Sequence, residues 1–441
     1  MSLPCYPHYK NSGASWMGDV PANWETRRAK HVFEVKKHIA GEEGYDILSI
    51  TQKGIKVKDI ESNDGQLSMD YGKYQFVEIG DFAMNHMDLL TGYVDISPFF
   101  GVTSPDYRVF SVRDSKHCDA KYFLYLYQNG YRQKIFYAFG QGASQLGRWR
   151  FPTEQFNDFI LPLPSLAEQT AIATFLDRET AKIDGLIAEQ EKLIALLAEK
   201  RQATISHAVT KGLNPAAPMK DSGVAWLGEV PAHWSVHSLR HHLKALFNGI
   251  TSDQIDEGKN TVPVTRIETI SKGVIDTEKL GYISADDARD DRLLLRGDIL
   301  FSNINSLNMI GNCAQYCDDT PIYAGMNLLV IRPVEYVNYS WLFLLIKSSL
   351  FRREIESRAK PAINQASIPQ SAILSITIAT PTFLEQVAIA NFINKETTRL
   401  DALAAEATHG IALLKERRSA LISAAVTGKI DVRHLAEAEA A

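Results

Sequence analysis

Two stretches of the chain carry the same long pattern of apolar positions. They begin PSLAEQTAIATFLD at Pro164 and PTFLEQVAIANFIN at Pro381, and they align without a gap at an offset of 217 residues. In each copy, apolar residues recur at spacings of three, four, seven and eight, as on one face of a helix. We expect two long helices that bury these stripes against each other. The stripe residues are Ile172, Leu176, Ile183, Leu186, Leu193, Leu197 and Ile205, then Ile389, Ile393, Leu400, Leu403, Leu414 and Leu421.

Each predicted helix has a start signal. Ser165 with Glu168, and Thr382 with Glu385, form the S/T-x-x-E pattern of a capping box directly after a proline. The pattern therefore predicts that the two helices begin at residues 165–166 and 382–383.

A second repeated motif lies before each helix. SGASWMGDVPANW occupies residues 12–24 (clip 1), and SGVAWLGEVPAHW occupies residues 222–234 (clip 2). The order of clip, variable segment and long helix thus occurs twice. A period this long indicates a duplicated domain pair, because solenoid repeats are only about 20–50 residues long. We interpret the clips as structural joints between each domain and the helices.

The segments between clip and helix diverge in sequence. They contain the strand-like runs YQFVEI, YRVFSV, LLLRGDILF and NLLVIRP, and helix-like runs at KYFLYLYQNGYRQKI and YSWLFLLIKSSLFRREIE. The predicted class is α+β: two mixed α/β domains, separated by two long antiparallel helices, with a pseudo-twofold internal duplication. The predicted segments are clip 1 with the residues before it (1–24), the first domain (25–160), the first helix (161–213), clip 2 with the residues before it (214–234), the second domain (235–375), the second helix (376–433) and a disordered tail (434–441).

Composition describes a globular protein without a membrane span. The chain has 441 residues, of which 45% are hydrophobic and 22% charged, and no apolar run approaches the roughly 20 residues of a span. Four cysteines do not make a disulfide framework, so we expect a reducing, cytoplasmic location. The net charge of −5 does not by itself indicate a nucleic-acid partner.

Motifs of enzymatic chemistry are absent from the sequence. There is no phosphate-binding loop, no G-x-G-x-x-G after a strand and no G-x-S-x-G. Cys313 and Cys317 lack a second pair at zinc spacing, and His237, His241 and His242 favour a local hydrogen-bonded cluster over a ligand set. We therefore expect a chain with no catalytic residue and no metal of its own.

Local cationic surface is the remaining binding signal. No acidic residue lies between Asp119 and Glu154, whereas lysines, arginines and aromatic residues alternate there. Asparagines crowd the loop 301–312, and their amides can pair with adenine edges. The competing interpretations are ordinary turns for the asparagines and helix-dipole partners for the arginines. The candidate DNA contacts are Lys121, Arg132, Lys134, Arg148, Arg150, Asn303, Asn305, Asn308, Arg352, Arg353, Lys360, Asn364 and Gln365.

Taken together, the motifs resemble a known family. The clips, the helix starts LAEQ and FLEQ, the tail SAAVTGKID and a Gly-Asp pair in each variable segment (Gly80–Asp81 and Gly297–Asp298) are similar to the specificity subunit of type I restriction–modification systems. The resemblance covers essentially the whole chain. The chain departs from it at Ser165 and Thr382, where the family often has a second proline, and a capping residue tolerates that change.

The resemblance implies a function and partners. It implies two target-recognition domains, each reading one half of a bipartite site in double-stranded DNA, with the helices as a spacer. The implied partners are two methyltransferase subunits and motor-nuclease subunits, which would carry S-adenosylmethionine, ATP and Mg. No base-contacting residue carries over by motif. The alternatives are a two-module protein-interaction scaffold with a coiled-coil core and, more weakly supported, a fused methylase-nuclease.

Overall fold

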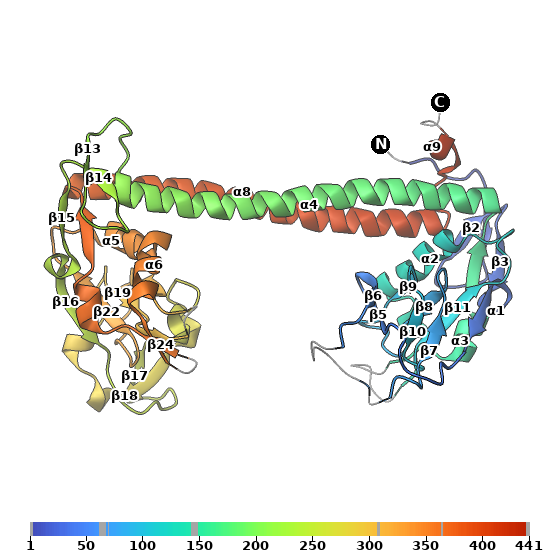
Figure 1. The fold of residues 1–441 in the computed structure, drawn as a ribbon, viewed down its shortest axis with the longest axis horizontal. Helices are drawn as coiled ribbons and strands as arrows, with labels where there is room; N and C mark the ends of the chain where they lie inside the picture. Colours follow the sequence, from blue (N-terminus) through green and yellow to red (C-terminus); the bar gives the residue numbers. More distant parts are fainter. Residues whose placement is uncertain are drawn as a thin grey trace. The chain divides into compact units, whose positions relative to one another are not determined.

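A computed structural model describes residues 3–60, 68, 70–142, 149–306, 309–362 and 365–437. The chain forms two compact units (Figure 1). Unit 1 combines Met1–Glu191 with His409–Ala441, and unit 2 is Lys192–Thr408. Each unit therefore contains one clip, one variable domain and a part of each long helix.

The variable domain of unit 1 is built on a four-stranded antiparallel sheet in the order β4-β11-β8-β9. Its strands are β4 (Phe33–Lys36), β8 (Phe82–Met84), β9 (Val94–Ile96) and β11 (Arg108–Val112). Two-stranded pairs surround it: β1 (Tyr9–Asn11) with β2 (Asp19–Pro21), β3 (Glu25–Arg28) with β12 (Ile160–Leu163), β5 (Leu48–Thr51) with β6 (Gly54–Val57), and β7 (Gln75–Val77) with β10 (Gly101–Thr103). The helices are α1 (Ala29–Val32), α2 (Ala120–Arg132), α3 (Thr153–Asp158) and α9 (Arg433–Glu437).

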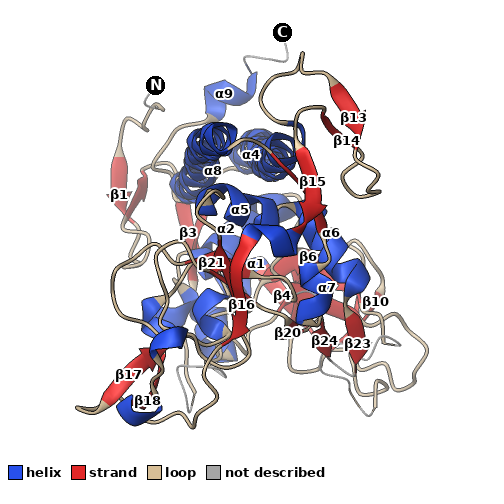
Figure 2. Ribbon diagram, turned by 90° about the vertical axis from the view of Figure 1, so that its left-hand side faces the viewer, coloured by secondary structure: helices blue, strands red, loops and turns tan. Residues whose placement is uncertain are grey.

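Unit 2 repeats this sheet with the order β16-β22-β19-β21. The strands are β16 (Leu243–Asn248), β19 (Ile299–Phe301), β21 (Cys313–Gln315) and β22 (Leu329–Pro333). The smaller sheets pair β13 (Met219–Asp221) with β14 (Glu229–Pro231), β15 (Ser235–Ser238) with β25 (Thr377–Thr380), β17 (Thr261–Val264) with β18 (Gly281–Ser284), and β24 (Gln365–Ser367) with both β20 (Ile304–Asn305) and β23 (Lys360–Ala362). Its helices are α5 (Tyr339–Lys347), α6 (Ser349–Arg358) and α7 (Gln370–Leu374). Figure 2 separates these helices and strands by colour.

The two long helices are α4 (Leu166–Lys211) and α8 (Phe383–Val426), and each runs unbroken through its internal glycine. Within unit 1, α4 and α8 share one apolar core, and Asp184 pairs with Arg418 at 2.8 Å. Within unit 2, Arg201 pairs with Asp401 at 3.1 Å. Higher residue numbers in α4 pair with lower residue numbers in α8, so the two helices run antiparallel in both units. This confirms the prediction.

Three predictions about local structure need correction. Leu186, Leu193 and Leu403 are 53%, 42% and 40% exposed, because a helix pair buries only a narrow seam and these side chains lie beside it. The single helix expected over 339–356 breaks at Ser348, whose extended backbone and hydroxyl cap α6 by accepting the Phe351 N–H at 3.2 Å. The tail expected to be disordered from 434 begins with α9; residues 438–441 lie outside the described range.

Candidate nucleic-acid interface

Each central sheet is anchored by a buried aspartate that follows a glycine in the left-handed region. Gly80 and Gly297 have φ angles of +93° and +98°. Asp81 then pairs with Lys36 at 2.6 Å, and Asp298 makes two contacts with Arg332, at 2.7 and 2.8 Å. The cation comes from β4 in unit 1 and from β22 in unit 2. The Gly-Asp motif is thus a structural anchor whose cationic partner could not be read from the motif.

The glutamine of the LAEQ and FLEQ helix starts joins each domain to its long helix. The buried Gln169 side chain accepts the Asp119 N–H at 2.8 Å and donates to the Pro164 carbonyl at 2.9 Å. Gln386 does the same with the Asn338 N–H at 2.7 Å and the Pro381 carbonyl at 3.0 Å. Asp119 caps α2 and Asn338 caps α5, so the same glutamine holds the equivalent helix in both units.

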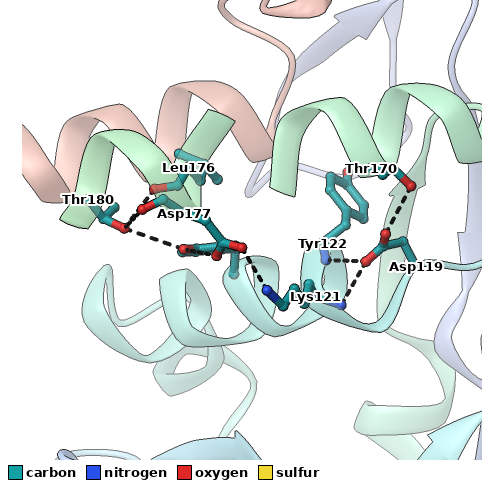
Figure 3. Close-up of polar contacts among 8 residues, drawn as sticks. Asp119, Lys121, Tyr122, Thr170, Leu176, Asp177 and Thr180 are labelled. Carbon is teal, nitrogen blue, oxygen red and sulfur yellow. Dashed lines mark hydrogen bonds and ion pairs between the residues drawn. The ribbon is translucent and has the colours of Figure 1, made fainter. Parts of the chain in front are cut away.

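Figure 3 shows a second attachment between α2 and α4 in unit 1. The Lys121 ammonium lies 2.7 Å from the Asp177 carboxylate, which also accepts the Tyr125 hydroxyl at 2.8 Å. The hydrogen bond to Asp177 raises the pKa of Lys121. Thr170 donates to the Asp119 carboxylate at 3.0 Å. This placement favours a docking role for Lys121 over the predicted DNA contact.

Of the other predicted cations of unit 1, Arg132, Lys134 and Arg150 lie in the described part of the chain. Arg132 lies at the opposite end of α2, about 16 Å along the helix, and donates to the Tyr93 hydroxyl at 2.8 Å. Lys134 follows in a left-handed turn, with a φ angle of +54°. Arg150 is exposed and its backbone forms a bridge with Gln141. Arg148 lies outside the described residues.

The aromatic residues interleaved with these cations are mostly core residues. Tyr122, Tyr127 and Phe136 are at most 1% exposed, and they pack with Phe33 and Phe156 in the main apolar cluster of unit 1. The expectation that they belong to a binding surface is wrong for these positions. Their apolar rings are buried because α2 packs between the sheet and α4.

The asparagine loop of unit 2 is mainly structural where it is described. Asn303 is 9% exposed, and its backbone carbonyl and side-chain amide both bond to Ile368. Asn305 donates to the Ser302 hydroxyl at 3.2 Å and accepts the Ser306 N–H at 2.8 Å. Asn308 lies outside the described residues. The turn interpretation therefore accounts for these two side chains.

A hairpin of β23 and β24 brings other predicted residues together. Its register pairs Lys360 with Ser367 and Ala362 with Gln365, so Lys360 and Gln365 share one face. The opposite face contains Ala366, which is 1% exposed, and through the β20 pairing it also contains Asn305. Lys360 and Gln365 are thus exposed on the outer face of a three-stranded sheet. Asn364 lies outside the described residues.

The two predicted arginines of α6 differ from each other. The guanidinium of Arg352 donates to Glu356 at 3.1 Å and to Asn312 at 2.8 Å. Arg353 is exposed and lines a shallow groove of about 570 Å³ beside α4 residues such as Ala203 and Ser206. Arg352 therefore ties α6 to the turn before β21, whereas Arg353 faces the groove.

Unit 1 also contains a polar cleft of about 740 Å³, which the sequence did not predict. Hydroxyl groups, two lysines and three tyrosines line it, and burial raises the pKa of both Tyr74 and Tyr107. Its walls come from segments of three separate parts of the domain, so no local motif marks it. The lining residues are Ile47, Leu48, Ser49, Ile50, Thr51, Lys58, Ser68, Asp70, Tyr71, Lys73, Tyr74, Thr103, Ser104, Pro105, Asp106 and Tyr107.

The clips contact the starts of the long helices within their units. The Trp24 indole N–H donates to the buried Glu168 carboxylate at 2.9 Å, and the Tyr6 hydroxyl donates to the same oxygen at 2.6 Å. In clip 2, the His233 ring lies 2.8 Å from Glu385, while the buried Trp234 N–H finds no partner among the described residues. The side chain of Glu385 instead completes the capping box by accepting the Thr382 N–H at 3.1 Å.

The described residues give no sign of a metal centre or a membrane span. No group of three or more potential metal ligands gathers in them. In the same part of the chain, no helix combines the length and apolar character needed to cross a membrane.

In the histidine cluster of unit 2, burial and neighbouring histidines lower the pKa of His242 to about 4, and its ring lies 3.2 Å from the Thr380 hydroxyl.

Comparisons with known proteins agree with this geometry. A model of the type I restriction modification DNA specificity domain matches residues 21–195. The putative type I restriction enzyme MjaX specificity subunit of Methanocaldococcus jannaschii is 38% identical over 38% of this chain and 40% of its own length. The type I restriction enzyme EcoKI specificity subunit of Escherichia coli K12 is 23% identical over 64% and 60%. The chain thus spans less than two thirds of either relative.

Two solved structures share the fold over nearly the whole chain. A chain from a study of complex assembly in the type I R-M system has a TM-score of 0.64 at 14% identity, covering 92% of this chain and 98% of its own. The HsdS subunit of Thermoanaerobacter tengcongensis has a TM-score of 0.56 at 14% identity, covering 93% and 98%. The family model identifies a type I DNA specificity domain in residues 21–195, and the structural likeness shows the shared fold. This chain is thus similar to type I specificity subunits in sequence over residues 21–195 and in fold over nearly its whole length.

Proposed function

We propose that this chain is the non-catalytic, DNA-reading subunit of a type I restriction–modification complex, and that each unit reads one half of a bipartite target. The observation that carries the proposal is the repeated architecture: both units place the same sheet order on the same clip and the same Gln169 or Gln386 attachment. Two like modules on one chain suit a target made of two half-sites.

In unit 2, the outer face of the β23–β24 hairpin is the best candidate for contact with bases. A two-stranded ribbon fits the major groove of B-DNA, where an amide can pair with adenine and an ammonium with guanine or phosphate. Gln365 and Lys360 supply these two groups on one exposed face. In unit 1, the polar cleft lined by Lys58, Lys73 and Tyr71 offers ammonium and hydroxyl groups for phosphate contacts, and Lys73 also pairs with Asp70 at 3.0 Å.

Catalysis and cofactors would then belong to partner subunits. We propose two methyltransferase subunits that bind S-adenosylmethionine, and motor-nuclease subunits that bind ATP and Mg. The purified chain alone should show no methyltransferase, nuclease or ATPase activity. Sustained S-adenosylmethionine turnover by the contaminant-free chain would contradict this part of the proposal.

Footprinting of the chain with its methyltransferase subunit on DNA tests the reading role. The expected result is two protected patches separated by an unprotected spacer, with methylation mapped to the same two half-sites. A single patch, or protection without sequence preference, would refute it and favour the protein-interaction scaffold. That scaffold is not favoured, because the family model that matches the chain is a DNA specificity domain.

The helices are proposed to set the distance between the half-sites, and matched insertions test this. Because Arg201 lies opposite Asp401, the peptide bond after Leu197 lies opposite the one after Ala404. Four residues added at both places lengthen the pair by about 6 Å, or nearly two base pairs at about 3.4 Å each. The variant should methylate sites whose spacer is one or two base pairs longer. Methylation at the original spacing would refute the spacer role.

A further inference from the structure

The long helices carry the same receptor face twice. Phe175 and Arg178 in α4 correspond to Phe392 and Lys395 in α8 at the repeat offset of 217. An aromatic ring followed three positions later by a cation lies on one helix face in both cases. The chemistry of this face is therefore duplicated together with the rest of the repeat.

In unit 1 the chain covers this face with its own C-terminal segment (Figure 1). Phe175 is only 3% exposed and belongs to the core that contains Val432 and has Leu435 packed against it. The Arg178 guanidinium donates to the Leu435 carbonyl at 3.2 Å and lies 5.7 Å from the centre of the Phe175 ring. Residue 435 lies within α9, so a short helix fills the receptor face.

In unit 2 the equivalent face is open in the described structure. Phe392 is 40% exposed and Leu384, two helical turns before it, is 80% exposed. The reason is the course of the chain: after α8, Gly428 leads into α9, whereas after α4, Gly212 leads within a few residues into β13, directly before clip 2. The repeat therefore has two receptor faces but one α9.

The chain's own α9 is held in unit 1. The Asp431 N–H donates to the Pro4 carbonyl at 2.7 Å, and the Arg433 guanidinium lies 5.0 Å from the centre of the Tyr6 ring. Ala216 stands where the clip alignment places the counterpart of Tyr6, so an occupant of the unit 2 face needs no equivalent of Arg433. It needs an apolar side chain for Phe392 and a backbone carbonyl for Lys395.

We propose that the α8 face formed by Leu384, Ala388, Phe392 and Lys395 is a docking site for a short amphipathic helix of a partner protein. The partner helix would take the place that α9 takes in unit 1, with a Val-x-x-Leu-like apolar pair against Phe392 and its C-terminal carbonyls toward Lys395. This docking does not depend on the proposed reading of DNA.

A fluorescent peptide of residues 430–437, IDVRHLAE, serves as the probe, with the full-length chain as receptor. We expect saturable binding of one peptide per chain, and at least fivefold weaker binding to Phe392→Ser. Leu403→Ser is the matched control, because Leu403 is equally exposed on the same helix. No saturable binding by the full chain, or equal binding to Phe392→Ser and Leu403→Ser, would overturn the proposal.

A chain that ends after Lys429, and so lacks both Val432 and α9, provides an independent test. Removing α9 should open the unit 1 face, so this chain should bind two peptides in place of one. A stoichiometry that stays at one would show that the two faces are not equivalent and would also overturn the proposal. DNA footprinting of Phe392→Ser should be unchanged, so failure of DNA recognition would be distinguished from failure of helix docking.

Discussion

The glutamate of the repeated helix start, Glu168 in unit 1 and Glu385 in unit 2, makes different contacts in the two units. Glu168 is 4% exposed and accepts hydrogen bonds from Tyr6 and Trp24, so it fastens clip 1. Glu385 is more exposed, caps its own helix and contacts His233. Burial raises the pKa of Tyr6, and its hydrogen bond to Glu168 adds to the shift, which keeps the hydroxyl a donor.

We attribute the difference to the residue that occupies the position of Tyr6 in each unit. Tyr6 belongs to the N-terminal segment, and clip 2 has Ala216 at the corresponding place. Without the tyrosine, Glu385 turns back to Thr382 and the Trp234 N–H is left without a partner in the described structure. A repeated motif therefore predicts a repeated element, but the contacts of its side chains depend on residues outside the motif.

The largest difference between the units should come from the buried aspartates. Asp298→Ala leaves the Arg332 guanidinium, 17% exposed, without its carboxylate, and should lower the unfolding free energy of unit 2 by about 3 kcal/mol. Asp81→Ala should cost less, because the Lys36 side chain is 34% exposed and can turn to water. Hydrogen exchange in each sheet measures both, and equal losses would contradict the argument.

Loss of the indole N–H should cost more stability at Trp24 than at Trp234. Trp24→Phe leaves the buried Glu168 short of a donor and should destabilise unit 1 by about 2 kcal/mol. Trp234→Phe removes a donor that has no partner among the described residues, so its cost should be limited to lost packing. Denaturant unfolding of the two variants compares them. A larger loss for Trp234→Phe would show that its N–H is satisfied in solution.

Acid should weaken both units, and unit 1 over a wider range. Burial lowers the pKa of His86 to about 3 and that of His242 to about 4, whereas the unfolded value is about 6.5. Below pH 6.5 these two histidines are protonated in the unfolded chain but stay neutral in the folded chain. The free energy of unfolding therefore falls by up to about 2 kcal/mol per histidine by pH 5. His86→Gln should flatten the loss in unit 1, including the part between pH 4 and 3. Unchanged pH dependence would refute the assignment.

The smallest expected effect concerns the β23–β24 hairpin. Lys360→Ala should weaken DNA binding a few-fold and reduce the slope of log K against log salt by about one. Asn305→Ala, on the inner face of the same sheet, should leave that slope unchanged. Affinity titrations over a salt series measure both. Equal slopes for wild type and Lys360→Ala would exclude a phosphate contact at this lysine.

The two long helices were well predicted. The apolar stripes and capping residues located the starts of α4 and α8 to within a residue, because both signals lie within each helix and its first turn. The candidate DNA contacts were less predictable. Lys121 bonds to Asp177 and Asn303 bonds to Ile368, and both partners are distant in the sequence and come together only on folding. The rings of Tyr122 and Tyr127 were misassigned for a related reason: an aromatic residue beside a lysine has the same local pattern in a core and on a binding surface.

The division of the chain between the units has a consequence for its synthesis. Unit 2 is contiguous, from Lys192 to Thr408, whereas unit 1 needs both the first 191 residues and the last 33. A ribosome that moves from the N-terminus therefore completes unit 2 first, although most of unit 1 is made earlier. Until Asp431 has been synthesised and can bond to the Pro4 carbonyl, the N-terminal part of unit 1 keeps some of its apolar surface exposed. A nascent chain stalled before residue 409 would be the form most dependent on chaperones.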